Sequence, residues 1–385
     1  MKNYLFKIYV LGYLNEYYLN NFHLNNKNDI NYKKFKTIKV AHYLKIPVNF
    51  FKVFISFIAF FEIPISIIIL TFLFIKYSFS YLVTKSITIT NKKLMFGYHV
   101  DEFAFNTMMN SMGINLDEIT IIKLPSINFK YPNYNSISIF SGVDFKDILK
   151  AYVYSFELIF YMKNKYGKKD FFFRSYSSFE YFLCYFFTKK SHQNNIYYFD
   201  ALVDRFAYLH GGLEHKTILI QHGYVFDKMR HHKIGKVNYA YYLNKKQKEN
   251  CEKVLFNNKP DFSYLNESVF KTTSNKLLKN KLKNILLICN MVFFDKEKEI
   301  IEDLSKKNIN LYVKPHPHSL FDPYENLKRT NNFDILQRED FPKVDIVISY
   351  YSTLAMSYKN YGIEVLMYSD ELFEYNYDKI VKQNI

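Results

Sequence analysis

From residue 92 onward, short apolar runs alternate with longer stretches in which apolar residues recur at helical spacing. The short runs have the length of buried strands, and the longer ones match helices that cover a sheet. Up to residue 260 this pattern predicts strands at 93–98, 119–123, 171–174, 196–199, 217–221 and 239–243, with helices at about 102–112, 145–163 and 179–187, a short helix ending near His210, and a Lys-rich helix before Pro260. Such alternation is typical of an α/β fold with a parallel sheet.

A second series of the same kind begins after residue 283. It predicts strands at 285–289, 310–314, near 335, 345–348 and 364–367, with helices at 296–306 and from about 352. The stretch between the two series is polar, rich in Lys and without a clear period, as linkers are. We therefore expect two Rossmann-like domains in tandem. Their expected boundaries are 91–260 and 284–385, with a linker at 261–283 and an N-terminal helical segment at 1–90.

The N-terminal segment contains an apolar stretch from Val53 to Ile75 whose one charged residue is Glu62. A stretch of 23 residues is long enough to span a bilayer. Glu62 and Pro64 would then place a carboxylate and a helix break near its middle. Three interpretations stay open: a monotopic hairpin or interfacial helix pair broken at Pro64, a true span, or buried core helices. The stretch begins too late in the chain for a cleaved signal peptide.

Positive charge is concentrated in the same segment. Of the formal net charge of +16, residues 1–100 carry +10, from thirteen Lys against three acidic residues. Seven of these Lys lie between Lys27 and Lys52, directly before the apolar stretch. Lys side chains attract a protein to an anionic leaflet, and apolar side chains enter the acyl boundary. We therefore expect residues 27–83 to contact a membrane surface.

Composition excludes several other classes of protein. The chain has 47 Lys but five Arg, and base readout relies on Arg, so we expect no nucleic-acid partner. Hydrophobic residues make up 49% and charged residues 23%, which rules out a wholly disordered chain. Cys184, Cys251 and Cys289 lie far apart in the sequence. This spacing excludes a disulfide framework and a cysteine-rich zinc module, and a reducing cytoplasm fits best.

Chemically useful residues gather at three predicted strand ends. Loops at the carboxyl ends of parallel strands line the binding crevice of open sheets, and helix N-termini offer free N–H groups to anions. The three ends read Gln221-His222-Gly223, Lys314-Pro315-His316-Pro317-His318 and Ser349-Tyr350-Tyr351-Ser352-Thr353.

The second and third of these ends suit a phosphate. Two prolines bracket His316 and stiffen the backbone, so its imidazole is held ready to donate to a phosphate oxygen, with charge added by Lys314 or His318. Ser352 and Thr353 open a predicted helix, where their hydroxyls can cap the helix and also hold a phosphate. A purely structural His316, and capping alone by the hydroxyls, are the competing interpretations.

Together these motifs resemble those of the GT-B glycosyltransferases of bacterial surface polysaccharides, over residues 92–368. The CDP-glycerol glycerophosphotransferases of teichoic acid synthesis and the sialyltransferases of capsule and lipooligosaccharide are especially similar. In those families an H-G turn lies late in the first domain, a K-P-H-P element follows a strand of the second, and a Ser/Thr pair opens a later helix. The resemblance implies that the two Rossmann-like domains face each other across a cleft, with the donor nucleotide held by the second.

By this resemblance, His316 and the Ser352-Thr353 turn hold the nucleotide and phosphates of the donor, and His222 faces them. Fixed hydrogen-bond donors stabilise the charge that grows on a departing phosphate. An imidazole titrates near neutral pH, so His222 is the candidate general base, with a structural turn His as the alternative. The runners-up on the neighbouring strand end are Asp200, Asp204 and Arg205. On the acceptor side we expect Gln221, Gly223 and Tyr224, with His231 and His232.

The sequence departs from those families at named positions. Their H-G-T-P-L-K is here His222 to Asp227, reading H-G-Y-V-F-D, and Tyr350 stands where they have Asp. Ser357 stands where many GT-B enzymes place a Glu that grips the ribose, five residues before Gly362. The resemblance implies catalysis without a metal ion, which fits a sequence that has no D-x-D pair. We therefore expect no metal, and no cofactor apart from the activated donor.

The sequence thus predicts a transferase that moves a sugar or polyol-phosphate from a nucleotide donor, preferably cytidine-linked, to a hydroxyl of a capsule, lipopolysaccharide or lipooligosaccharide glycan. We expect it at the cytoplasmic face of the bacterial inner membrane, peripheral or monotopic. Two alternatives stay open. One is a non-catalytic, membrane-bound scaffold of a polysaccharide assembly complex, which the departures in the motifs favour. The other is a nucleotide-sugar epimerase of the same two-domain design.

Overall fold

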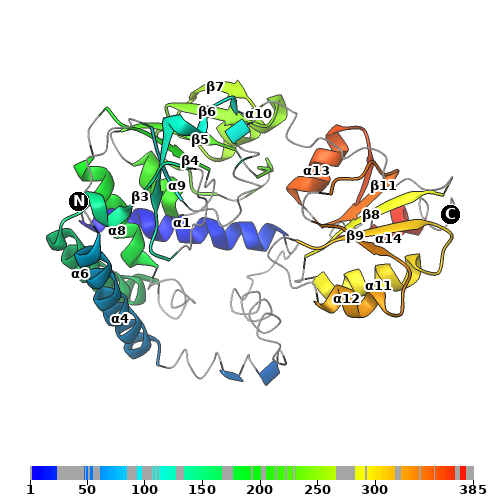
Figure 1. Cartoon of the computed structure of the whole chain (residues 1–385), viewed down its shortest axis with the longest axis horizontal. Helices are drawn as coiled ribbons and strands as arrows, with labels where there is room; N and C mark the ends of the chain where they lie inside the picture. The colour runs from blue at the N-terminus through cyan, green and yellow to red at the C-terminus, as the bar shows by residue number, and fades with distance from the viewer. Residues whose placement is uncertain are drawn as a thin grey trace. The chain divides into compact units, whose positions relative to one another are not determined.

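A computed structural model of the chain describes residues 2–23, 47, 49–50, 53–54, 61–84, 93–97, 106, 109–110, 112–126, 134–166, 177–191, 194–200, 205–212, 215–221, 223–227, 229, 231–265, 282–290, 293–316, 322–337, 340–350, 352–368 and 373–378. The chain divides into two compact units. The first unit comprises Met1–Leu19 and Ser56–Val269, and the second comprises Asn20–Ile55 and Phe270–Ile385. Figure 1 shows a sheet with covering helices in each.

The first unit is built on a seven-stranded sheet in the order β3-β2-β1-β4-β5-β6-β7. All six neighbouring pairs are parallel. In this doubly wound order the chain reverses direction across the sheet between β1 and β4, which is the topological switch point. The strands are β1 Lys93–Phe96, β2 Ile119–Lys123, β3 Ser136–Ser138, β4 Ile196–Phe199, β5 Lys216–Ile220, β6 Tyr239–Tyr242 and β7 Asp261–Tyr264.

Helices of the first unit bury aromatic side chains against one another. Along α8, every residue from Ser178 to Thr188 is buried, so this helix is enclosed on all sides. Rings of α6 and α8 interlock, as where Tyr154 meets Phe182 edge-on at 5.6 Å. The helices are α1 Lys2–His23, α4 Glu62–Val83, α6 Phe145–Tyr166, α8 Ser178–Lys190, α9 Arg205–Gly211 and α10 Lys245–Val254, with 3-10 turns η1 Leu116–Glu118 and η2 Ile139–Gly142.

Helix α1 is part of the first unit's core. Phe6 and Tyr9 are buried, and the Tyr9 ring packs on Tyr181 of α8 at 5.0 Å. Asn15 is fully buried and fixes the other end of the contact: its Nδ2 donates to the backbone oxygen of His232 (2.9 Å), and its Oδ1 accepts from His232 N–H (2.7 Å). Residues 1–19 therefore pack with residues far along the chain, whereas the sequence analysis grouped them with a separate segment of residues 1–90.

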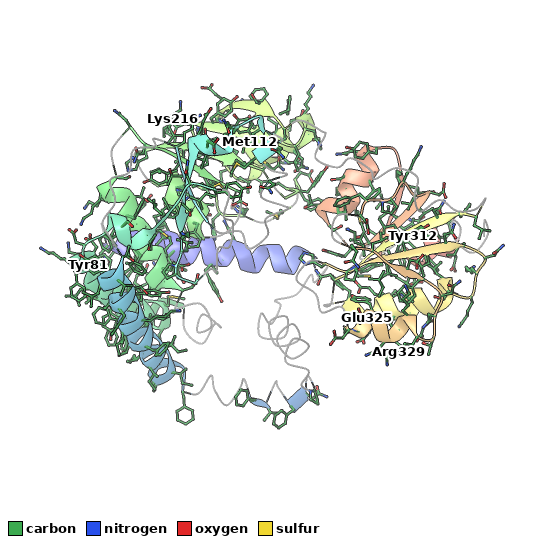
Figure 2. The ribbon with its side chains drawn as sticks, in the orientation of Figure 1. Tyr81, Met112, Lys216, Tyr312, Glu325 and Arg329 are labelled. Atoms are coloured by element: carbon green, nitrogen blue, oxygen red, sulfur yellow. The ribbon has the colours of Figure 1, made fainter. Side chains whose placement is uncertain are left out.

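Helix α4 begins near Pro64 and is not broken by it. Proline is tolerated in the first turn of a helix, where its missing N–H has no helical partner to lose. Pro64 therefore lies in the first turn of α4, just after a turn at Phe61, and the three interpretations of residues 53–75 stay predictions. Residues 63–83 are long and apolar enough to cross a membrane, a test that core helices of soluble proteins also pass. Tyr81, labelled in Figure 2, packs on Phe145 of α6 at 6.1 Å.

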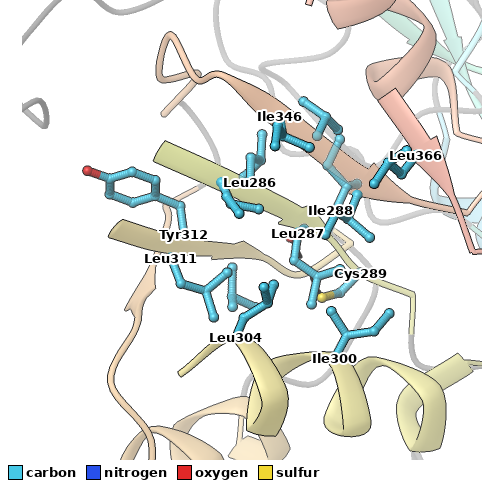
Figure 3. Packing of buried hydrophobic residues seen from close by; sticks show 14 of the residues in the cluster. Leu286, Leu287, Ile288, Cys289, Ile300, Leu304, Leu311, Tyr312, Ile346 and Leu366 are labelled. Atoms are coloured by element: carbon cyan, nitrogen blue, oxygen red, sulfur yellow. Dashed lines mark hydrogen bonds between the residues drawn. The ribbon is translucent and has the colours of Figure 1, made fainter. Parts of the chain in front are cut away.

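The second unit is built on a five-stranded sheet in the order β10-β9-β8-β11-β12, again parallel throughout. Its switch point lies between β8 and β11. Figure 3 shows the core, in which Leu286 and Ile346 come from neighbouring strands, and Ile300 and Leu304 from the helix packed on the sheet. The elements are β8 Asn284–Ile288, α11 Phe294–Leu304, β9 Asn310–Lys314, α12 Asp322–Lys328, β10 Asp334–Ile335, β11 Ile346–Ser349, α13 Thr353–Asn360, β12 Glu364–Met367 and α14 Phe373–Tyr377.

The expected α/β class with two Rossmann-like sheets is confirmed, since both sheets have the predicted strands in a doubly wound order. The sequence analysis did not predict β3, β7, α12 and α14. Strand β7 falls at the start of the predicted 261–283 linker, and the first unit continues to Val269. The predicted strand at 171–174, and most of the predicted helix at 102–112, lie outside the described residues.

Candidate functional site

The carboxyl ends of the second unit's strands lie at one level of the sheet. Register places Lys314 of β9 beside Ile288 of β8, Ile288 beside Ser349 of β11, and Ser349 beside Met367 of β12. Strands β9 and β11 both pair with β8, so their ends lie about 10 Å apart. The segments after Lys314 and Ser349, which contain the predicted site residues, therefore leave the sheet at the same edge. This edge lies next to the switch point, where ligands bind such sheets.

Ser352 caps α13. Its Oγ accepts a hydrogen bond from Ala355 N–H (3.1 Å) and lies 3.0 Å from the Oγ of Ser349. Ser349 is fully buried and Ser352 nearly so, while Thr353, the first residue of the helix, is half-buried. The capping interpretation is thus correct for Ser352. The phosphate-binding role of Ser352 and Thr353 stays a prediction, since one N-terminal turn can serve both purposes.

Lys314 has a structural task at the end of β9. Its ammonium donates to the backbone oxygens of Gln337 (2.7 Å) and Asp340 (2.8 Å) and lies 4.5 Å from the centre of the Phe341 ring. The side chain is buried, and charge-assisted hydrogen bonds to carbonyls satisfy it there. Lys314 therefore ties the segment after β10 to the sheet edge. Its expected contact with a donor phosphate is untested.

His316 follows two residues after the last residue of β9, behind a buried Pro315. It is half-buried at the sheet edge, as expected for a side chain held at a strand exit. The second proline of the motif, Pro317, and His318 lie outside the described residues. The hydrogen bond from His316 to a phosphate stays a prediction.

Glu297 is a buried carboxylate at this edge that the sequence analysis missed. It is fully buried on α11, accepting from Asn290 N–H (2.5 Å), the Tyr324 hydroxyl (2.6 Å) and the Tyr368 hydroxyl (2.6 Å). Burial raises the pKa of Glu297 to about 7, although these hydrogen bonds, and one from Cys289, oppose the shift. Through these hydrogen bonds Glu297 joins the loop after β8 to the first turn of α12 and to the residue that follows β12.

A sequence signal for Glu297 did exist. The positions 297, 300, 301 and 304 form one face at helical spacing, and the other three are apolar and buried. An acidic residue in line with Ile300, Ile301 and Leu304 indicates a buried, hydrogen-bonded carboxylate, because an isolated charge is too costly to bury.

Three aromatic rings pack beside this carboxylate. Phe293 stacks on Tyr350 at 5.8 Å and meets Tyr368 edge-on at 5.5 Å. Burial raises the pKa of Tyr350 to about 12, so its hydroxyl stays neutral at physiological pH. Tyr350, which stands where similar families have Asp, thus brings an aromatic ring to the switch point in place of a charge.

In the first unit, Asp200 follows β4 at the switch point and is buried. Its charge opposes the lowering of the His210 pKa, which burial first and His215 second bring down to about 3. His210 is fully buried and stacks on Phe199 at 4.9 Å. Asp200 therefore lies close to a neutral core histidine. Its catalytic role stays a prediction, and so does that of Asp204, which lies outside the described residues.

Buried amides hold the turn after β5. Gln221 Nε2 donates to the backbone oxygen of Gly223 (2.9 Å) and to Oε1 of Gln247 (2.7 Å). The same Oε1 accepts from Val225 N–H (2.7 Å), and Asn250 Nδ2 donates to the Val225 oxygen (2.7 Å). The residues on both sides of position 222 are thereby fixed by α10. We call Gln221, Gln247 and Asn250 the amide network.

The remaining predicted residues divide as follows. His222 lies outside the described residues, and only the backbone of Arg205, the first residue of α9, is described. Tyr224 is half-buried within the turn that the amide network holds. His231 contacts Asn15, with 2.8 Å between its Nε2 and the Asn15 amide nitrogen, and burial lowers the His231 pKa to about 3. The structure therefore gives His231 a place in the contact that fixes α1.

In the part of the chain that the structure describes, no group of three or more His, Cys, Asp or Glu side chains is placed to hold a metal ion. The three cysteines, all within the described residues, are buried and form no disulfide. The metal-independent chemistry expected from the sequence remains a prediction.

Comparison with known proteins gives distant structural likenesses. The chain matches no family model, and no curated protein sequence is detectably similar to it. The wall teichoic acid polymerase TagF, in a variant soaked with CDPG, aligns in one soak with a TM-score of 0.39 and 11% identity over 77% of this chain and 75% of TagF. Another soak aligns with a TM-score of 0.41 and 10% identity over 83% and 80%. Acinetobacter baumannii MurG aligns with a TM-score of 0.33 and 12% identity over 76% of this chain and 91% of MurG.

Proposed function

We propose that the chain is a GT-B glycosyltransferase or polyol-phosphate transferase that uses a nucleotide-activated donor, preferably cytidine-linked, and a hydroxyl of a bacterial surface glycan as acceptor. The observation that carries the proposal is the common register of Lys314, Ile288 and Ser349. It supports a single anion site, because the segments bearing His316, Ser352 and Thr353 leave the sheet on either side of β8. Ligands bind doubly wound sheets at this kind of edge.

The chemistry follows from the charge on the leaving group. As the bond to the donor breaks, negative charge grows on the departing phosphate oxygens, and the pair of electrons stays with them. An imidazole N–H of His316, the hydroxyl of Thr353 and the first N–H groups of α13 are groups that can donate to those oxygens. Because such donors are fixed before the reaction, they favour the transition state over the ground state.

A base must take the proton of the acceptor hydroxyl, and His222 is our candidate. It follows Gln221 in the sequence, and the amide network holds the described residues before and after it, Gln221 and Gly223. A neutral imidazole can accept a proton near neutral pH. His222→Ala should lower kcat far more than donor affinity, and an equal loss of both would instead indicate a positioning role.

The test begins with a panel of CMP-, CDP-, UDP- and GDP-linked donors, following nucleotide release with and without glycan acceptor. We expect release from one base class, accelerated by acceptor. His316→Ala should then lower turnover about 100-fold at an unchanged melting temperature. His215→Ala is the matched control, since His215 precedes β5 at the opposite, amino end of its strand. Activity that survives in His316→Ala would show that the site is elsewhere, and donor binding without any release would favour the scaffold.

A further inference from the structure

Helix α4 presents an apolar ridge to solvent. Its members Ile68, Phe72, Ile75, Phe79 and Leu82 are 67, 65, 56, 69 and 74% exposed. They follow one another at alternating intervals of four and three residues, so they line a single face over about 21 Å of helix. Exposed apolar side chains scattered singly are normal, but a contiguous row marks an interaction surface.

The opposite face of α4 is fixed to the first unit. Leu70 and Tyr77 are buried, and the Phe74 ring packs on Tyr152 of α6 at 4.8 Å. The Thr71 hydroxyl lies 3.1 Å from that of Tyr152. Only 17% of the most apolar 18-residue stretch of α4 is buried, so α4 is not a core helix. It is nevertheless docked to the first unit along one side. A helix that crossed a bilayer would have to break these contacts to surround itself with lipid.

Helix α6 widens the ridge into a broader surface. Phe145, Leu149 and Val153 are 44, 45 and 42% exposed and recur every four residues along α6. Phe145 touches α4 directly, with its ring 6.3 Å from that of Phe74. Figure 1 shows α4 and α6 side by side. We call the ridge together with these three residues the apolar surface.

Positive charges outnumber negative ones next to the apolar surface. Lys76 of α4 and Lys146 and Lys150 of α6 are exposed. The exposed Asp144, directly before α6, and Asp147 of α6 share Lys190 as their ion-pair partner, and Glu157 of α6 pairs with Lys2 (2.8 Å). Seven further Lys precede α4 in the sequence, between residues 27 and 52. Exposed lysines around an apolar face complement an anionic lipid leaflet, which offers phosphates to the lysines and acyl chains to the ridge.

We propose that the apolar surface lies on an anionic lipid bilayer, with α4 flat in the headgroup region and the first unit standing on it. The acyl boundary takes up Phe72 and Phe79, while Lys76 reaches the phosphates. This proposal is independent of the proposed function, because it concerns the helices of the first unit and not the strand ends. The membrane contact expected for residues 27–83 is thereby narrowed to one face of α4 and extended to the exposed apolar residues of α6.

Flotation of the full chain with vesicles tests the contact. Wild type should float with phosphatidylcholine–phosphatidylglycerol vesicles, and Phe72→Gln/Phe79→Gln should lower the bound fraction at least about tenfold. Lys76→Gln should lower it about fivefold, and only when phosphatidylglycerol is present. Tyr375→Gln is the matched control, because Tyr375 is 67% exposed on α14 of the other unit. Wild-type flotation by the double variant would overturn the proposal, as would a wild-type oligomer that the double variant loses while neither protein floats.

A second measurement separates a flat helix from a spanning one. The chain has no Trp, so Phe72→Trp or Leu82→Trp introduces a single Trp at an exposed position, which can be excited apart from the Tyr residues. Both should shift to shorter wavelength with anionic vesicles and be quenched equally by shallow brominated lipids, since a flat helix holds both at one depth. Tyr375→Trp should not shift. Position 72 lies near the middle of residues 63–83 and position 82 near their end, so quenching depths that differ between them would show a spanning helix. Absence of any shift would show that lipid does not cover this surface.

Discussion

The two sheet edges of this protein are organised by different chemistry. At the edge of the first unit, neutral amides fix the turn after β5 through Gln221, Gln247 and Asn250. At the edge of the second unit, the carboxylate of Glu297 and the hydroxyl of Ser352 fix the loops around the switch point. Amides keep one charge state at all pH values, whereas a carboxylate does not. The first edge should therefore hold its shape across the pH range, and the second should depend on proton binding.

The largest effect is expected for Glu297→Gln, which should remove the dependence of the second edge on proton binding. The ordinary pKa of this side chain is 4.5, and burial raises it to about 7 in the folded protein. Between these values the unfolded chain loses this proton first, so the contribution of Glu297 to the free energy of unfolding should fall as pH rises, by about 3 kcal/mol in all, against the rise that the buried His210 and His231 add over the same range. The neutral glutamine should abolish this fall. Denaturant unfolding followed from below pH 4.5 to above pH 7 measures the difference.

The matched control is Glu325→Gln, whose side chain is exposed on α12, as Figure 2 shows. It should keep the wild-type dependence on pH. If the free energies of unfolding of Glu297→Gln and wild type change with pH in parallel, then Glu297 is not the group that makes the second edge sensitive to pH.

The next largest effect is expected for Gln247→Leu, which disrupts the amide network. This change removes the acceptor of Val225 N–H and one partner of Gln221, leaving a buried donor without a hydrogen bond. We expect the free energy of unfolding to fall by about 2 kcal/mol, equally at low and high pH. Gln337→Leu, at an exposed position, should stay within about 0.5 kcal/mol of wild type. A cost that varies with pH, or no cost beyond this control, would contradict the comparison.

The smallest effect is expected at the cap of α13. Ser352→Ala removes the acceptor of Ala355 N–H and should lower the free energy of unfolding by about 1 kcal/mol, while Ser352→Asp should retain most of it. Ser357→Ala is the control: the Ser357 hydroxyl bonds the Thr353 oxygen one turn back, a contact that does not stabilise helices. Thermal unfolding compares the three. Equal melting temperatures for Ser352→Ala and Ser357→Ala would show that the cap is not needed.

The central strands could be predicted from sequence to within one or two residues. The predicted bounds of the central strands β2, β4 and β9 are those of the structure, because a strand buried on both faces has a mostly apolar run. The bounds of the edge strand β12 were also predicted correctly, since it ends in the apolar run Val365 to Met367. The missed strands lie at edges: β3 reads Ser-Ile-Ser and is half-buried, and β7 is largely exposed. These two edge strands lack the apolar run that marks their neighbours, so pattern alone did not reveal them.

For the site, sequence located the strand ends but not the partners of each side chain. Ser352 was correctly placed as a cap, since capping depends on local spacing. The contacts of Lys314 with the segment after β10, and of Glu297 with Tyr324 and Tyr368, join residues distant in the chain. Such partners follow from how strands and helices are assembled, which spacing does not encode.

The contact between Asn15 and His232 joins residues 217 positions apart. During synthesis at about 5 to 20 residues per second, Asn15 leaves the ribosome roughly 10 to 40 s before His232 is made. The aromatic partners of α1 lie on α6 and α8, so until residue 190 has been made the aromatic side of α1 lacks its contacts. Nascent chains of this protein should therefore depend on chaperones most strongly before α8 emerges, and Asn15 gains its own partner only with His232.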